Sequence, residues 1–68
     1  MKKRKLNEKE IEVLKLTAQG CTDIEIGETL HISPGYVRRI LEALYNKSDA
    51  VNKANLVSWG YENKVLGG

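Results

Sequence analysis

One short pattern occurs four times along the chain. An apolar residue precedes a short polar residue, and a second apolar residue follows four positions after the polar one. At the start of a helix, such a polar side chain bonds an otherwise unpaired backbone N–H, and the apolar pair packs across the first turn. The sequence therefore predicts four helix starts. The polar residues and their apolar pairs are Asn7 with Leu6 and Ile11, Thr22 with Cys21 and Ile26, Ser33 with Ile32 and Val37, and Asn52 with Val51 and Leu56.

Further signals mark where these helices begin and where they end. Glu10 and Glu25 stand three residues after the first two caps, where a carboxylate completes a capping box. Pro34 takes a first helical position, where its missing N–H costs nothing, and Gly20 suits the left-handed residue that ends a helix. No stretch alternates as a strand does. The predicted fold class is all-α, with helices over residues 8–19, 23–30, 34–47 and 53–62.

The second and third predicted helices have the spacing of a helix-turn-helix. Two helices that cross steeply through a short turn need apolar residues on their inner faces and at the corner. Gly27 stands where the two backbones would approach, although glycine in a helix interior costs up to about 1 kcal/mol relative to alanine. Its presence indicates close packing. The apolar positions are Ile26, Leu30, Ile32, Val37 and Ile40.

The third predicted helix has two distinct faces. Val37, Ile40, Leu41 and Leu44 recur at helical spacing and are expected to point inward. Arginine can pair with guanine, asparagine with adenine, and glutamate can accept from cytosine, so the opposite face has the side chains that read bases. An ordinary solvated face is the alternative interpretation. This outward face holds Gly35, Arg39, Glu42 and Asn46, with Arg38 on its flank.

The composition argues against several classes of protein. With 68 residues the chain fits one domain, and it has one cysteine and one histidine, which cannot form an internal disulfide or a metal cage. We find no nucleophile–base pair and no phosphate-cradling glycine loop. No apolar run is long enough to cross a membrane. We therefore expect a cytoplasmic protein that is not an enzyme and has no cofactor, membrane partner or small-molecule ligand.

The charge is unevenly distributed along the chain. Residues 1–5 include four basic residues, residues 6–30 have a net charge of −4, and residues 31–68 have a net charge of +2. The basic start could follow phosphates or the minor groove, or it could be a solvated tail. We expect a basic tail over residues 1–5, a domain over 6–66 and a flexible end over 67–68.

With its caps, its helix-turn-helix spacing and its two-faced third helix, the chain resembles the LuxR-type (GerE-like) helix-turn-helix domain over about residues 6–66. The resemblance implies a four-helix fold and a transcription regulator that binds DNA as a dimer, with the third helix in the major groove and the fourth joining the two chains. The matching stretches are Leu6–Glu10, Glu12–Leu14, Leu16, Ala18, Gly20, Thr22–Gly27, Leu30–Ser33, Tyr36–Arg38, Leu44, Lys47 and Asn52–Lys53.

The same resemblance implies site residues. Arg38, Arg39 and Glu42 correspond to positions that contact bases in the family. Phosphate contacts are implied for Thr22, Tyr36, Lys47 and Lys53. The chain departs from the family pattern where tyrosine replaces the usual threonine at position 36, lysine replaces arginine at position 53, and Ser48-Asp49 replaces a Leu-Gly turn.

The fourth predicted helix carries the expected dimer contact. Its outer face holds Asn55, Trp59 and Glu62, opposite the inward Leu56, Val57 and Gly60. Because an exposed tryptophan is common as an interface anchor, we expect Trp59 at the centre of a two-fold contact; the alternative is that it packs on its own core. We expect the core to be completed by Tyr61, Val65 and Leu66.

The sequence thus predicts a small transcriptional regulator that binds specific double-stranded DNA sequences as a homodimer. The alternative is a helical protein-interaction module, docking on RNA polymerase or another regulator, with weak or no DNA binding. Salt separates the two, because binding through many phosphates weakens steeply as salt rises.

Overall fold

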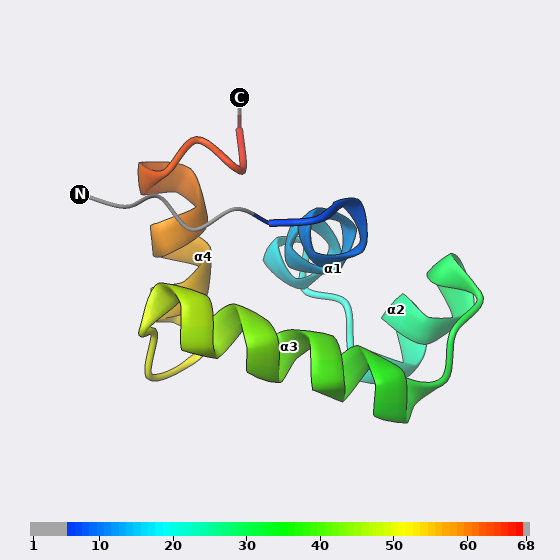
Figure 1. Ribbon diagram of the computed structural model, residues 1–68. Coiled ribbons are helices and arrows are strands. Elements are labelled where there is room, and N and C mark those ends of the chain that lie inside the picture. Colours follow the sequence, from blue (N-terminus) through cyan, green and yellow to red (C-terminus); the bar gives the residue numbers. More distant parts are fainter. Residues whose placement is uncertain (1–5, 68) are drawn as a thin grey trace.

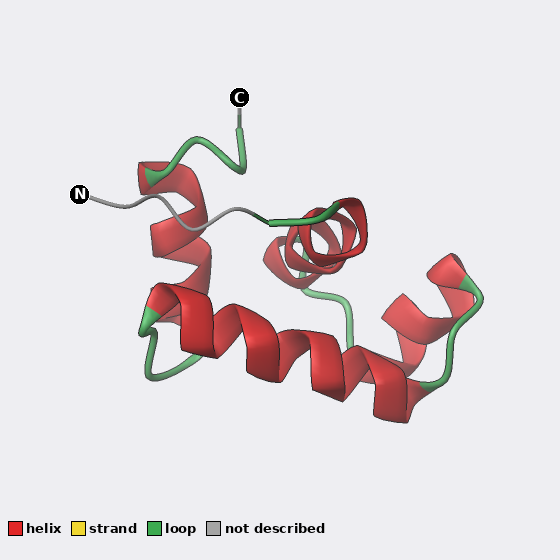
Figure 2. Cartoon of the chain, in the orientation of Figure 1, coloured by secondary structure: helices red, strands yellow, loops and turns green. Residues whose placement is uncertain are grey.

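The computed structural model describes residues 6–67, so the predicted basic tail over residues 1–5 lies outside the described part of the chain, as does Gly68. Within residues 6–67 there are four helices and no strand (Figure 2). The predicted all-α class is confirmed, and the predicted helix ends differ from the observed ones by a single residue in two helices. The helices are α1 (Glu8–Ala18), α2 (Asp23–Leu30), α3 (Pro34–Ser48) and α4 (Lys53–Glu62).

The longest helix, α3, runs along one side of the molecule (Figure 1). The shorter helix α2 crosses near its beginning, and α4 rises from near its end. The first helix, α1, packs against each of the other three. One long face of α3 is therefore free of other helices.

The predicted helix starts are confirmed by their hydrogen bonds. At α1 the Asn7 side chain accepts from the Glu10 N–H at 2.8 Å, and the Glu10 carboxylate accepts from the Asn7 N–H at 3.0 Å. At α2, Thr22 and Glu25 form the same reciprocal pair at 3.1 and 2.8 Å. Both predicted capping boxes are present, because each polar side chain satisfies a donor that the helix leaves unpaired. The caps of α3 and α4 are Ser33 and Asn52.

The glycine predicted at the end of the first helix is confirmed. Gly20, after α1, has a φ of +91°. The helices α2 and α3 instead end on His31 and Asp49, with φ of 61° and 60°. Aspartate and histidine enter this left-handed region more readily than most residues, so they take the position that glycine often holds. A search for glycine could not have found these two ends.

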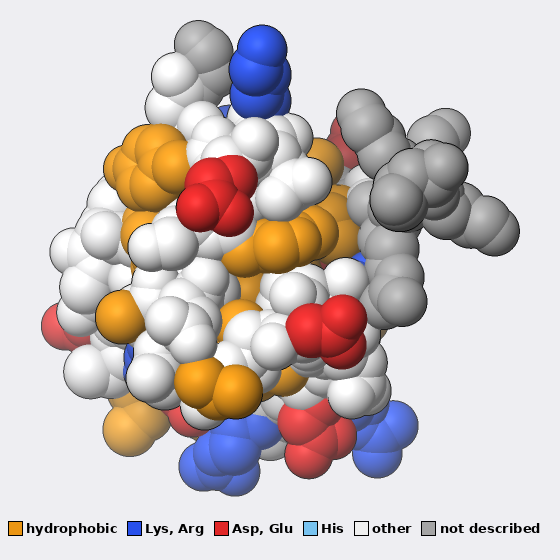
Figure 3. All heavy atoms as spheres, turned by 90° about the vertical axis from the view of Figure 1, so that its left-hand side faces the viewer, with side chains coloured by type: hydrophobic (Ala, Val, Ile, Leu, Met, Phe, Trp, Pro, Cys, Tyr) orange, Lys and Arg blue, Asp and Glu red, His pale blue; other side chains and the backbone are white. Residues whose placement is uncertain are grey.

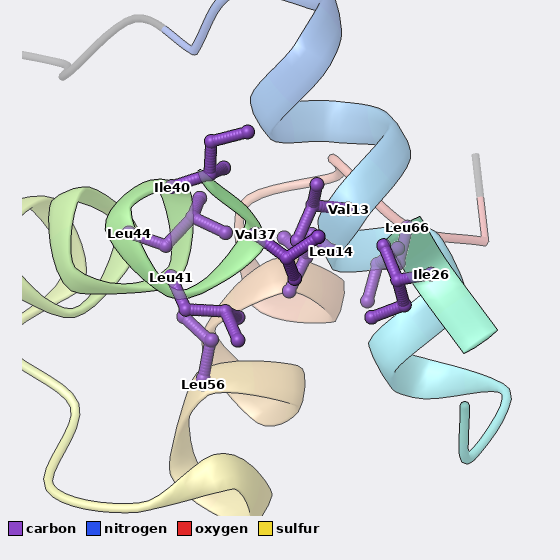
Figure 4. Close-up of a cluster of buried hydrophobic side chains, with 9 residues drawn as sticks. All are labelled: Val13, Leu14, Ile26, Val37, Ile40, Leu41, Leu44, Leu56 and Leu66. Atoms are coloured by element: carbon purple, nitrogen blue, oxygen red, sulfur yellow. The ribbon is translucent and has the colours of Figure 1, made fainter. Parts of the chain in front are cut away.

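The core lies between the four helices and is closed by the segment after α4 (Figure 4). The stripe predicted on α3 is buried throughout. Gly60 on α4 lets the buried Leu66 approach, because a Cβ at position 60 would lie 2.8 Å from the Leu66 side chain. The buried apolar residues are Val13, Leu14, Ile26, Val37, Ile40, Leu41, Leu44, Leu56 and Leu66.

Two apolar residues lie elsewhere than predicted. Val51, expected to pack against Leu56 across the first turn of α4, is 81% exposed, and Ala50 packs against the core beside it. Tyr61, expected in the core, is 56% exposed and covers Gly67, where a Cβ would lie 2.8 Å from the ring. In each case a nearby apolar residue packs in the core instead, Ala50 beside Val51 and Leu66 after Tyr61.

Candidate nucleic-acid interface

The corner between α2 and α3 is as tight as the spacing predicted. A Cβ on Gly27 would lie 2.6 Å from the Ile32 carbonyl oxygen, which belongs to the backbone and cannot rotate away. The Ile32 N–H donates to the Gly27 carbonyl at 2.9 Å. Two backbones thus meet at position 27, and they fix the angle at which α3 leaves the turn.

The outward face of α3 is exposed along its length. Gly35 has only the Ser33 hydroxyl within 4 Å of its position for a Cβ, so packing does not require glycine there. The polar face is separate from the buried stripe and is exposed to solvent. Its exposed residues are Gly35, Arg38, Arg39, Glu42 and Asn46.

On one flank of this face, Arg38 pairs with Asp23 in the first turn of α2. The Arg38 Nε lies 3.4 Å from the Asp23 carboxylate, and the two side chains are 68% and 27% exposed. An ion pair this exposed adds at most about 1 kcal/mol to stability. It does restrict the directions that the guanidinium can take.

On the other flank, α3 faces the beginning of α1 across a shallow notch. Tyr36, Arg39 and Ala43 lie on the α3 side, and Lys9 lies on the α1 side. Among the ion pairs formed within residues 6–67, none involves Arg39. The two flanks therefore differ, because one arginine is held by an acid and the other borders an open notch. The full lining is Asn7, Lys9, Glu10, Tyr36, Arg39, Ile40 and Ala43.

Lys47, for which we expected a phosphate contact, forms an ion pair within the domain. Its ammonium lies 2.8 and 3.0 Å from the two carboxylate oxygens of Glu10, whose side chain is only 7% exposed. This bridge ties the beginning of α1 to the end of α3. The sequence did contain a signal for it, because Glu10 falls in one helical stripe with the buried Val13 and Leu14.

The other expected phosphate contacts are on the surface. The Thr22 oxygen accepts a bond from the Glu25 N–H, but its O–H can still donate. Tyr36 is 48% exposed, and Lys53 is exposed at the first position of α4. These three residues come from the starts of three different helices.

The three residues of the expected dimer face differ in exposure. Trp59 is only partly exposed and packs against the core, whereas Asn55 and Glu62 are exposed. The alternative interpretation, that the ring packs on its own chain, is therefore correct for much of its surface. Figure 3 shows that hydrophobic side chains still appear across this side of the molecule. Basic and acidic side chains lie side by side at its lower edge, where Figure 1 places α3.

The described residues offer little for other chemistry. Among residues 6–67, no group of histidine, cysteine or acidic side chains could hold a metal ion. None of the four helices is long and apolar enough to cross a membrane.

A tight corner between two helices, followed by a long helix with an exposed polar face, defines a helix-turn-helix domain. The sequence matches the family GerE, described as bacterial regulatory proteins, luxR family, over residues 4–59. The chain belongs to this family, and it is a DNA-binding regulatory domain. The match ends at Trp59, so the segment that contributes Leu66 lies beyond it. No curated protein matches the chain.

Proposed function

We propose that this domain binds specific sequences of double-stranded DNA in the cytoplasm, with α3 in the major groove, as a homodimer joined through α4. One observation carries the proposal. The outward face of α3 is polar and exposed, while its opposite face is buried and the Gly27 corner fixes its direction. An α-helix fits the width of the major groove, so such a face can meet base edges.

The side chains on this face suit base recognition. Arg38 can donate two parallel bonds to guanine. Because the ion pair with Asp23 already restricts the guanidinium, Arg38 loses less conformational entropy on binding. Glu42 repels phosphates but can accept from cytosine N4. Asn46 has the donor and acceptor pair that matches adenine. The mixture of charges favours selectivity over general attraction to the backbone.

Phosphate contacts would set the position of α3 in the groove. Thr22 and Lys53 lie at the beginnings of α2 and α4, on either side of α3 in the chain. Gly35, in the first turn of α3, leaves space for a phosphate to approach the backbone N–H groups there. Such contacts orient a protein on the duplex without reading its sequence.

The dimer contact is supported by the apolar surface around α4. Val51 and Tyr61 are exposed at its two ends, and Trp59 is partly exposed between them. A domain of this size buries a small core, so covering this surface with a second copy would add stability. Two copies would place two reading helices about 34–36 Å apart, one turn of DNA, and would favour a pseudo-palindromic site.

Selection of bound duplexes from a random library tests the proposal. We expect an enriched motif with two inverted half-sites, and affinity that falls steeply between about 50 and 200 mM salt. Arg38→Ala should cost about 1–3 kcal/mol of binding free energy and relax the preference at one base position. An equal loss on every duplex would place Arg38 on the backbone.

Failure to enrich any motif would favour the protein-interaction module instead. The surface of α1 and α2 gives that alternative a specific basis, because four glutamates on these helices are exposed. They would suit a basic partner, and a pull-down with core RNA polymerase would reveal one such partner. The four residues are Glu8, Glu12, Glu25 and Glu28.

A further inference from the structure

The notch between α1 and α3 is not explained by base reading. We infer that it holds one phosphate of the DNA backbone, contacted by Lys9, Tyr36 and Arg39. The inference rests on the proposed function and adds α1 to the surface that touches DNA. It also gives Arg39 a role that differs from that of Arg38.

The electrostatics of the notch favour an anion. Among the described residues, Glu10 is the only acid that lines it, and its carboxylate is bonded to the Lys47 ammonium and to the Asn7 N–H. With Glu10 neutralised in this way, Lys9 and Arg39 leave the notch positively charged. A phosphate between them would be attracted by both.

The shape of the notch fits a small group held from two sides. Tyr36, Arg39 and Ala43 follow one another at helical spacing, so they form one stripe along α3. The short side chain of Ala43 leaves space at the floor, while the half-exposed Tyr36 can donate its O–H. Lys9 approaches from α1. Donors from two helices therefore converge on the same gap.

The side chains, and not the end of the α1 helix, would make these bonds. Asn7 and Glu10 already form a capping box at the beginning of α1. The opposite flank lacks the same attraction, since Asp23 there balances Arg38. If α3 enters the major groove, the α1 flank therefore meets one backbone strand with a net positive charge and the α2 flank does not.

The test compares two lysines on α1. Lys9 lines the notch, whereas the exposed Lys15 lies on other surfaces of the same helix. Binding of Lys9→Ala and Lys15→Ala would be measured by fluorescence anisotropy between 50 and 200 mM salt. The probes are a duplex that the unmodified chain selects from a random library and a scrambled duplex of the same length.

We expect Lys9→Ala to reduce the salt slope by about one, which corresponds to a loss of about twentyfold at 50 mM and about fivefold at 200 mM salt. The factor should be the same on both duplexes, because a phosphate contact reads no sequence. Lys9→Arg should restore the slope, and Lys15→Ala should leave it unchanged. Arg39→Ala should also weaken both duplexes equally.

Two other outcomes overturn the inference, and they are distinguishable. If the unmodified chain binds the selected duplex but Lys9→Ala and Lys15→Ala have the same slope, the notch holds no phosphate and the proposed function stands. If the unmodified chain enriches no duplex from the random library, the proposed function fails and the inference fails with it. A melting curve for each variant shows that the compared chains are folded.

Discussion

The two ends of α3 are connected to the rest of the molecule in different ways. At its beginning, the corner with α2 is closed by backbone, with the Gly27 and Ile32 main chains in contact. At its end, the corner with α4 contains the left-handed Asp49 and the exposed Val51. The first corner leaves no space for even one methyl group. The second leaves an apolar side chain in solvent.

The second corner is held by side-chain contacts made by α3 and α4. The bridge from Lys47 to Glu10 anchors the end of α3 to α1, and Gly60 allows Leu66 to pack onto α4. This difference matches the proposed roles of the two corners, which are to direct α3 into the groove and to border the dimer contact. The corner that aims the reading helix is rigid by itself, whereas the corner beside the dimer surface depends on side chains and keeps apolar area exposed.

The largest expected effect comes from adding one methyl group at the first corner. Gly27→Ala should lower the free energy of unfolding by about 2–3 kcal/mol, because the Cβ would meet a backbone oxygen at 2.6 Å. Urea denaturation measures this effect. Gly35→Ala is the matched control, since it has space for the methyl group and should be close to neutral. Equal effects of the two substitutions would remove the distinction between the corners.

Removing the bridge should have the next largest effect. Lys47→Met keeps the aliphatic stem but leaves the Glu10 carboxylate, 7% exposed, without its cation. We expect a loss of about 1–2 kcal/mol in unfolding free energy, since one side of the bridge remains in partial contact with water. Lys15→Met, at an exposed position of α1, is the control. If the two variants have the same unfolding free energy, α1 does not support the end of α3.

Replacing Asp49, whose backbone is left-handed, with glycine should stabilise the chain. Asp49→Gly removes the steric cost of a φ of 60° and should raise the unfolding free energy by about 0.5–1 kcal/mol. The reverse exchange, Gly20→Asp, places a side chain at a φ of +91° and should be destabilising. A loss of stability in Asp49→Gly would show that the aspartate side chain has a role that its backbone angle does not explain.

The smallest effect on stability is expected at Val51. Because this side chain is 81% exposed, Val51→Ser should change the unfolding free energy of the monomer by less than about 0.5 kcal/mol. Sedimentation should nevertheless show weaker self-association if the residue lies in the dimer contact. Thr29→Ser, at an exposed position on α2, serves as the comparison. Unchanged association would move the dimer surface away from the second corner.

The sequence predicted the first corner well because its signals are local. Cap, proline, corner glycine and apolar stripe all lie within residues 22–44, and each acts on its own helix or on the next. The second corner could not be predicted in the same way. Whether Val51 or Ala50 faces the core depends on how α4 meets α1, which is distant in the chain.

The candidate site shows the same limit. The outward residues of α3 followed from helical periodicity alone, and the structure exposes all of them. The partners of Lys47 and Arg38 could not be predicted in this way, because Glu10 and Asp23 lie 37 and 15 residues earlier in the chain. The exposed fraction of Trp59 likewise depends on the packing of α4 against the core.

The separation between the two faces of α3 has a consequence for how this domain can diversify. None of the outward residues belongs to the buried cluster, so exchanging them leaves the packing of the four helices intact. Under the proposed function, duplicated copies of such a gene would acquire new target sequences through a few substitutions in this segment while keeping the same fold. The same property makes the domain a convenient scaffold for engineered regulators with altered target sites.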